Sequence, residues 1–454
     1  MKYRYREPHE MKDSGVEWLG MIPKEWERKY LKFLIKKIID NRGRTPQFGD
    51  IGIPMLEVKQ ITQGDKSPSL NFEKFVLADI VKEYERDCVK EGDILISTVG
   101  ATSGKSVLVD KNPNYFIAQN VIGMRAKNNI HNVFLYYLLS SRYFKDSLES
   151  INKSNTIDNL KVSVFMNNFC IVSPKREQEK IATFLDQKTA EFDNIIAKKQ
   201  AFIDKLAEAK KSLISEVVTG KKKISVNNEK LIVENRKAED MKDSGVEWLG
   251  MIPKEWGRGK LKLLSERTIV GIAEATTQAY RDTGVPIVRA TNLKNETILT
   301  DDLLYLDEKF ANNISSKKLI EGDILTVRTG NAGISAVVPK ELDGAHCFTM
   351  LITTLSKKAN PKYINYILNS VNGQSYFDIT AWGTAQKNIS VPILQEFILP
   401  ITNPNNQQVI VDFLDQKTSE LDKVIQKIKL QIEKLKEAKQ SLISEAVTGK
   451  IEVM

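Results

Sequence analysis

The strongest constraint on the fold of this chain is an internal repeat. Sixteen residues, MKDSGVEWLGMIPKEW, occupy positions 11–26 and return unchanged at 241–256. A second pair of segments, 184–221 and 413–450, agrees at about two-thirds of its positions. Both pairs are separated by nearly the same distance along the chain, so the 454 residues form two tandem copies of one unit. Two copies of this length are too few and too long for a solenoid.

The two copies agree at their ends and differ in their middles. Residues 27–175 and 257–400 share only scattered landmarks, such as the motif EGDIL followed by a glycine. Short runs rich in β-forming residues, broken by Gly, Asn and Pro, fill both middles. Each middle also contains one helical run, at 132–148 and at 361–377. We therefore predict an α+β domain of roughly 150 residues in each copy.

The repeated closing segments are predicted to be long helices that pair with each other. Apolar residues recur every seven positions, which is typical of a coiled coil. Pro174 precedes the first helix, and Gly220 and Gly449 end the two helices. Neither stripe can be buried by its own helix, so we expect the two helices to pack together antiparallel. The predicted stripe consists of Leu185, Phe192, Leu206 and Leu213 in the first helix, and of Leu414, Leu421, Ile428, Leu435 and Leu442 in the second.

These patterns predict a fold class and a set of boundaries. The fold class is α+β, with two α/β domains separated by two long antiparallel helices that form an intramolecular coiled coil with pseudo-twofold repeat. The polar segment 222–240 is interpreted as the linker between the copies. The predicted parts are residues 1–175 (first domain), 176–221 (first helix), 222–240 (linker), 241–404 (second domain) and 405–454 (second helix).

Composition narrows the class of protein. The net charge is +9 and the pI about 9.0, which favours nucleic acid only weakly over a lysine-rich surface. No run of eighteen apolar residues occurs, and the charged start has no apolar segment typical of a secretory signal. The three cysteines and three histidines are scattered, so neither a disulfide framework nor a metal cluster is expected. A cytoplasmic protein without a membrane span fits these features.

Three stretches imitate catalytic motifs. GATSGKS at 100–106 is one residue short of a phosphate-binding loop, and its counterpart in the second copy has no lysine. KNPNYF at 111–116 has an asparagine where adenine methyltransferases place a second proline. Asp50, Glu57 and Lys59 could form a magnesium-dependent nuclease site, but the second copy has arginine and threonine at the last two positions. We predict no catalytic residue and no metal ligand, and an autonomous nuclease or methyltransferase remains the alternative.

The candidate DNA contacts are polar residues that occupy equivalent positions in the two copies but differ in type. The frames IPMLEVKQ and VPIVRATN are interpreted as strands that present different side chains, and so are the turns that follow EGDIL. Arg, Lys, Gln and Asn are the side chains that pair with base edges in the major groove. With the arginines of NRGRTP and with Lys387, the predicted contacts are Arg42, Arg44, Lys59, Gln60, Thr102, Ser103, Lys105, Arg289, Thr291, Asn292, Arg328, Thr329, Asn331 and Lys387.

The identical sixteen-residue segment at 11–26 and 241–256 needs a separate explanation. Its tryptophans, Trp18 and Trp26 with Trp248 and Trp256, are predicted to be packing anchors at the start of each domain. Packing tolerates small changes of shape, so it does not explain complete identity. We interpret the phrase and the repeated helices as surfaces that bind two copies of one partner.

The order of these motifs resembles the specificity subunit of a Type I restriction–modification enzyme. The resemblance covers nearly the whole chain and rests on IPKEW, NRGRTP, EGDIL and a proline followed by glutamine before each helix, although the second copy lacks a plain GRTP. It implies a non-catalytic subunit that recognises a bipartite site in double-stranded DNA. It also implies two methyltransferase subunits and motor-nuclease (restriction) subunits as partners. No cofactor is expected on this chain, and S-adenosylmethionine, ATP and Mg²⁺ are expected on those partners.

Overall fold

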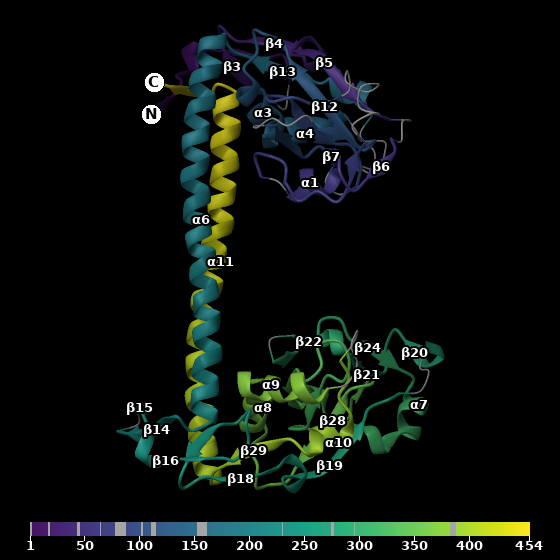
Figure 1. Ribbon diagram of the computed structural model, residues 1–454, viewed down its shortest axis with the longest axis vertical. Coiled ribbons are helices and arrows are strands. Elements are labelled where there is room, and N and C mark those ends of the chain that lie inside the picture. The colour runs from purple at the N-terminus through teal and green to yellow at the C-terminus, as the bar shows by residue number, and fades with distance from the viewer. Residues whose placement is uncertain are drawn as a thin grey trace. The chain divides into compact units, whose positions relative to one another are not determined.

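The computed structural model shows two compact units that divide the chain in an unexpected way. The first unit comprises residues 1–200 together with 429–454, and the second comprises 201–428. Each unit therefore contains one recognition domain and a part of both long helices (Figure 1). The structure describes residues 2–16, 19–42, 46–63, 65–77, 88–100, 103–109, 115–151, 161–228, 230–273, 277–294, 296–381 and 387–454.

Two four-stranded sheets form the framework of the first domain. The first sheet has the strand order β10–β9–β12–β5 (Ser106–Leu108, Ile94–Ser97, Val121–Ala126 and Ile35–Asp40), and all of its pairs are antiparallel. The second has the order β11–β7–β8–β6 (Phe116–Ile117, Ile53–Leu56, Phe75–Val76 and Phe48–Gly49), with a parallel pair between β11 and β7. The strand β13 (Phe169–Val172) pairs with β4 (Glu27–Tyr30) and returns the chain to the start of the domain.

The second domain repeats this arrangement strand by strand. Its first sheet, β26–β25–β28–β19, matches the first sheet of the first domain (Ser335–Val337, Ile324–Thr326, Leu351–Leu355 and Ser265–Val270). Its second sheet, β27–β21–β24–β20, again has one parallel pair (His346–Cys347, Val285–Val288, Leu304–Leu306 and Tyr280–Arg281). The middles differ in sequence and yet share a fold, so the predicted pair of α+β domains is confirmed.

Each predicted helical run is in fact two helices that meet at a buried serine. In the first domain α3 (Asn132–Ser140) and α4 (Arg142–Ile151) meet at Ser141, and in the second α8 (Pro361–Asn369) and α9 (Val371–Thr380) meet at Ser370. Both serine hydroxyls donate 2.6 Å hydrogen bonds to a carbonyl of the preceding helix. Both also accept one from a backbone N–H of the following helix. Such competition with the backbone ends a helix.

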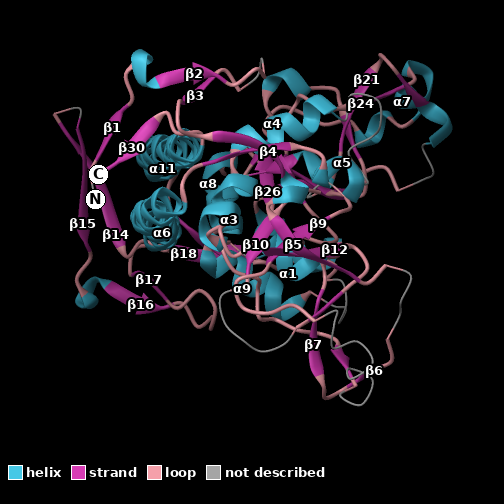
Figure 2. Ribbon diagram, turned by 90° about the horizontal axis from the view of Figure 1, so that it is seen from above, coloured by secondary structure: helices cyan, strands magenta, loops and turns pink. Residues whose placement is uncertain are grey.

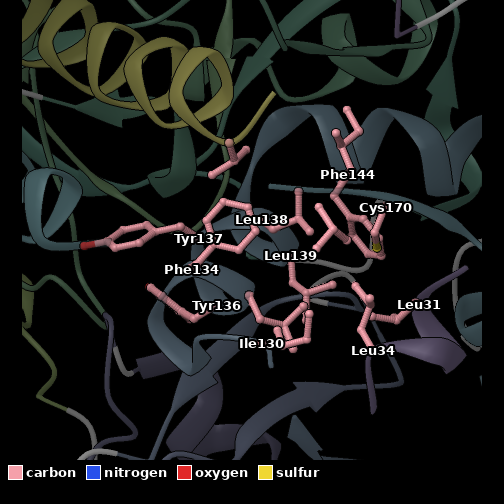
Figure 3. Packing of buried hydrophobic residues seen from close by; sticks show 14 of the residues in the cluster. Leu31, Leu34, Ile130, Phe134, Tyr136, Tyr137, Leu138, Leu139, Phe144 and Cys170 are labelled. Carbon is pink, nitrogen blue, oxygen red and sulfur yellow. The ribbon is translucent and has the colours of Figure 1, made fainter. Parts of the chain in front are cut away.

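The helix α3 lies at the centre of the first core. Its apolar side chains pack with Leu31 and Leu34 at the 3-10 turn η2 (Leu31–Phe33) and with residues of α4 and β13 (Figure 3). The last turn of the C-terminal helix also joins this cluster through Ile443, Ala446 and Val447. The second unit has the corresponding core, in which Ile214, Val217 and Val218 take the place of those three residues. The end of a long helix therefore forms part of the hydrophobic core of each domain.

The two long helices are α6 (Lys175–Val218) and α11 (Pro404–Val447), drawn in teal and yellow in Figure 1. Within the first unit Lys439 Nζ lies 2.6 Å from a carboxylate oxygen of Asp193. Within the second, Lys210 Nζ lies 2.8 Å from Asp422. The residue number falls along α11 as it rises along α6, so the helices run antiparallel as predicted. The two ion pairs occupy repeated positions, which explains why both segments keep these residues.

The predicted stripe is shielded from solvent along both long helices. All of its members are buried or half-buried, among them Leu185, Leu414 and Ile428. Ile203 and Ile432, beside the stripe, are also buried. No helix in the described ranges is long and apolar enough to cross a membrane.

A small two-stranded sheet closes each unit at the end of a long helix. In the first unit β1 (Tyr3–Tyr5) pairs with β30 (Ile451–Val453), so the two chain termini lie together (Figure 2). In the second unit β14 (Lys222–Asn227) pairs with β15 (Lys230–Asn235). The predicted linker is therefore largely a β-hairpin.

Candidate nucleic-acid interface

The predicted strand frames end earlier than the sequence suggested. In the first domain β7 stops at Leu56, and Lys59 and Gln60 lie in the short helix α1 (Val58–Gln63). In the second domain β21 stops at Val288 and a 3-10 turn, η7 (Ala290–Asn292), follows. The interpretation of these frames as continuous strands is wrong, because short apolar runs do not distinguish the end of a strand from the start of a helix.

Gln60 and Asn292 are structural residues in these turns. Both are almost fully buried, with 1% and 3% of their surface exposed. Gln60 accepts a hydrogen bond from the backbone N–H of Glu57 and donates to the carbonyl of Asn71. Asn292 makes the equivalent bonds with the N–H of Arg289 and the carbonyl of Asp302. Their polar atoms are occupied by backbone, so we correct their prediction as base-contacting residues.

The residue that follows the strand carries opposite charge in the two domains. In the first domain Glu57 accepts a 2.7 Å hydrogen bond from Lys74, and Lys59 pairs with Glu73. In the second domain Arg289 occupies the place of Glu57, and its guanidinium lies 3.1 Å from Asp302. The exposed Thr291 follows it. One frame therefore presents a carboxylate in one domain and a guanidinium in the other.

Arg42 is also held by a neighbouring carboxylate. It follows β5 and makes hydrogen bonds of 2.5–3.0 Å to both oxygens of Asp40. Partial burial raises the pKa of Asp40, but the hydrogen bonds from Arg42 outweigh burial, so the net pKa of Asp40 is lowered. Arg44 and Thr102 lie outside the described residues.

The motif EGDIL builds a turn around a buried aspartate. Asp93 and Asp323 are each 1% exposed, and each accepts a hydrogen bond from a backbone N–H three residues before it. The glycine before each aspartate has a positive φ, of 83° and 86°. Asp93 pairs with Arg125 on β12, at 2.7 Å, whereas Asp323 pairs with Arg267 on β19, at 3.0 Å. The motif therefore maintains the fold, and the arginine comes from a different strand in each domain.

The turns that follow EGDIL differ in what they expose. In the first domain Lys105 is half-buried and donates to the carbonyl of Thr62, and Ser103 is half-buried as well. In the second domain Thr329 and Asn331 are exposed. Lys105 is therefore oriented inward in this structure, and the second turn is the more open one.

In the second domain the structure brings two of the predicted segments together. Arg328 Nε donates a 3.2 Å hydrogen bond to Asn388 Oδ1, and the backbone N–H of Ile389 donates to the carbonyl of Arg328. Thr329 and Asn388 form an isolated β-bridge. The exposed Lys387 pairs with Asp378. Asn388 is a member of this cluster that the sequence analysis missed, since nothing in the sequence places residue 388 beside residue 328.

The surface cations of this candidate interface share one arrangement. Arg42, Lys59, Arg289 and Lys387 each pair with a nearby carboxylate. Exposed pairs of this kind are worth about 0–1 kcal/mol, so a DNA phosphate can replace the carboxylate at small cost. Within the described residues, no three or more His, Cys, Asp or Glu side chains form a potential metal site.

A repeated contact attaches each domain to its long helix. Tyr137 donates a 2.7 Å hydrogen bond to Asp186 on α6 and lies 3.0 Å from the hydroxyl of Thr189. Tyr366 donates an equal bond to Asp415 on α11. Burial raises the pKa of both tyrosines, so their hydroxyls stay protonated and act as donors. The repeated letters DQKT therefore orient the domains on the helices.

These observations define a class of protein: two recognition domains of one fold, with different exposed polar residues, each fixed to one of a pair of antiparallel helices. The sequence model of the Type I restriction modification DNA specificity domain matches the chain twice, at residues 23–205 and 253–434. The chain belongs to this family and is a Type I specificity subunit with two recognition domains.

Curated relatives and a solved structure agree with this assignment. The chain is 23% identical over 456 residues to the putative type I restriction enzyme MjaX specificity subunit of Methanocaldococcus jannaschii, covering 96% of both chains. It is 23% identical over 212 residues to the type I restriction enzyme StySPI specificity subunit of Salmonella potsdam, covering 44% of each. A chain from a structural study of complex assembly in the type I R-M system shares the fold, with a TM-score of 0.63 at 13% identity over 94% of this chain and 99% of that one.

Proposed function

We propose that this chain selects the DNA site of a Type I restriction–modification complex and reads a bipartite sequence, one half-site per recognition domain. The observation that carries the proposal is one fold that presents different side chains at the same position. Glu57 in the first domain and Arg289 in the second follow the same strand and form ion pairs of opposite sense. Two such surfaces suit two different short sequences.

The exposed candidates supply two kinds of contact. Arg42, Lys59 and Lys387 are proposed to bind phosphates, which gives affinity that falls with salt. Arg289, Arg328 and Asn331 are proposed to reach base edges. An arginine that pairs with a guanine contributes about 1–3 kcal/mol of discrimination, so Arg289→Ala should relax one base preference by that amount.

The helices are proposed to bind the partner subunits. Ile195 on α6 and Val424 on α11 occupy repeated positions and are 44% and 43% exposed. Apolar side chains kept exposed at both positions indicate a surface that a partner covers. We propose two methyltransferase subunits on these helices, with motor-nuclease subunits joining them. The chain itself contributes no catalytic group. S-adenosylmethionine, ATP and Mg²⁺ are proposed to bind the partners.

The experiment that tests this function exchanges residues 27–175 for the corresponding middle of another specificity subunit. Methylated adenines are then mapped in a host that carries the complete system. We expect one half of the methylated sequence to change and the other half to remain. A change in both halves would reject one domain per half-site. Methylation or cleavage of DNA by the purified chain alone, with S-adenosylmethionine or Mg²⁺, would favour an autonomous enzyme.

A further inference from the structure

The sixteen-residue phrase folds into the same hairpin in both units. In the first unit β2 (Met11–Asp13) pairs with β3 (Met21–Pro23), and in the second β16 (Met241–Asp243) pairs with β17 (Met251–Pro253). The register of the two hairpins is the same, with each methionine of the second strand opposite an aspartate of the first.

Packing explains the identity of the buried positions. Gly449, which ends α11, lies so close to the first hairpin that an added Cβ would be 2.4 Å from Pro23 and 3.1 Å from Trp26. Gly220, which ends α6, has the same distances to Pro253 and Trp256. Both glycines have a positive φ, of 72° and 73°. Since each helix end and each hairpin fit without spare room, neither side of the contact can change alone.

The turn of the hairpin explains two further positions. The carboxylate of Asp13 accepts a 2.9 Å hydrogen bond from the N–H of Gly15, and Asp243 does the same for Gly245. Both glycines have a positive φ, of 70° and 66°, which few other residues adopt without strain. These residues are exposed and yet fixed by the backbone of the turn.

Four exposed positions have neither of these two reasons, although in the second unit Glu255 forms an ion pair with Arg236 and Lys242 Nζ donates a hydrogen bond to the carbonyl of Lys254. Met21 and Met251 are 46% and 42% exposed, although they are apolar and lie in strands. The other three positions are also exposed in both units. Substitutions of solvent-exposed residues usually change the free energy of unfolding little, so such positions tend to differ between two copies. The four repeated pairs are Lys12 and Lys242, Met21 and Met251, Lys24 and Lys254, and Glu25 and Glu255.

We propose that these four residues in each unit, the hairpin surface, form a docking surface for the methyltransferase subunit, and that the chain binds one copy at each hairpin. The inference rests on the proposed function, since that function names the partner. An exposed methionine fills an irregular apolar socket well, because its side chain is flexible and polarisable. The lysines and the glutamate around it set the orientation of the partner through complementary charges.

The charges and the duplication favour this partner over two others. DNA is a poor fit, because the hairpin surface mixes Lys12 and Lys24 with Glu25 and stands beside Asp13, which would repel phosphates. A second copy of this chain is also a poor fit. Two self-complementary surfaces on every chain would join chain to chain without an end, unless the geometry closed a ring. A different protein that binds twice satisfies both hairpins.

The test coexpresses the chain with the methyltransferase subunit of its own system and counts bound subunits by native mass spectrometry. The variants are Met21→Glu, Met251→Glu and the double variant. Leu70→Glu and Ile320→Glu are the matched controls, since both residues are exposed and apolar, and the repeated position of the other unit holds Thr300 or Lys90. Circular dichroism and thermal melting check that all variants fold. Salt-dependent DNA binding by the wild-type complex checks the proposed function separately.

We expect two methyltransferase subunits on the wild type and on both controls. Each single variant should lose one of them, and the double variant should lose both. Lys24→Glu and Lys254→Glu should weaken the same contacts at least several-fold. If the double variant keeps both subunits, the hairpin surface is not the docking surface, and the proposed function is unaffected. If the wild type binds no methyltransferase subunit and no DNA, the proposed function itself fails.

Discussion

The two recognition domains form ion pairs at equivalent positions, but with different partner residues. In the first domain Arg125 reaches the buried Asp93 from β12, and in the second Arg267 reaches the buried Asp323 from β19. In the first domain Lys66 pairs with Asp186 on α6, whereas the second domain has Glu296 at the repeated position. The fold therefore fixes where an ion pair forms. The sign of the charge, or the strand that supplies the partner, can differ between the two domains.

Because these partners can differ, one fold can present two different recognition surfaces. The retained residues, such as the aspartate of EGDIL and the tyrosine on α3 or α8, are themselves buried or half-buried in both units. The residues that differ, such as Glu57 and Arg289, have exposed partners and can change at small energetic cost. Variation is concentrated where the structure tolerates it.

The largest expected effect comes from removing the arginine of the buried pair. Arg125→Ala leaves the carboxylate of Asp93 buried without its charge partner and should lower the free energy of unfolding by about 3–5 kcal/mol. Arg267→Ala should cost about 1 kcal/mol less, because Asp323 keeps a 2.6 Å hydrogen bond from Thr354. Hydrogen exchange of each domain measures both losses.

A double variant sharpens the same comparison. Lys37 and Thr354 stand at the positions that correspond to Arg267 and Arg125. Lys37→Arg with Arg125→Thr should therefore give the first domain the arrangement of the second and recover most of the stability that Arg125→Thr alone removes. No recovery would contradict the equivalence of the two domains.

The next effect concerns the glycines that end the long helices. Gly449→Ala and Gly220→Ala should each destabilise their own unit by about 2–4 kcal/mol, through the positive φ and the clash with proline. The two losses should be equal within error, because the two sites have the same geometry. Thermal melting of the two variants, compared with Gly330→Ala, whose Cβ would meet nothing within 4 Å, separates the clash from the φ effect.

A smaller effect should follow from the tyrosines that orient the domains. Tyr137→Phe and Tyr366→Phe each remove one hydrogen bond to an aspartate and should cost about 1.5 kcal/mol. Denaturant unfolding of the two single variants gives the comparison. A loss in only one unit would show that this contact is not equivalent in the two domains.

The smallest effect depends on pH. Burial raises the pKa of Glu296, and Asp422 raises it further, although Lys210 opposes this. The folded state therefore binds the proton more tightly, so stability is lost as the pH rises through the raised pKa. Glu296→Gln should stabilise the second unit by about 0.5 kcal/mol at neutral pH and have no effect well below the ordinary carboxyl pKa. Melting temperatures at both pH values test this sign.

The sequence predicted the repeat, the two α+β domains and the antiparallel helices because each leaves a local or periodic signal. Heptad spacing predicts the apolar stripe, and the β-rich runs with one helical run in each middle predict two α+β domains. The candidate site was predicted less well. Gln60 and Asn292 have the chemistry of base-reading residues but are buried, and only the backbone that folds around them shows it.

Partners from distant segments could not be predicted either. The arginine that pairs with Asp93 lies 32 residues further along the chain, on a neighbouring strand. In the second domain the arginine precedes its aspartate by 56 residues. Asn388 reaches Arg328 in the same way, across 60 residues. Such contacts depend on strand order, which single-sequence patterns do not determine.

The most direct test of the central claim replaces residues 257–400 with a second copy of residues 27–175, so that both frames carry the same reader. Methylated adenines are mapped in a host with the complete system. If each recognition domain independently determines one half-site, the methylated site should contain the original first half-site twice. Retention of the original second half-site would contradict the claim that each domain alone determines its half of the sequence.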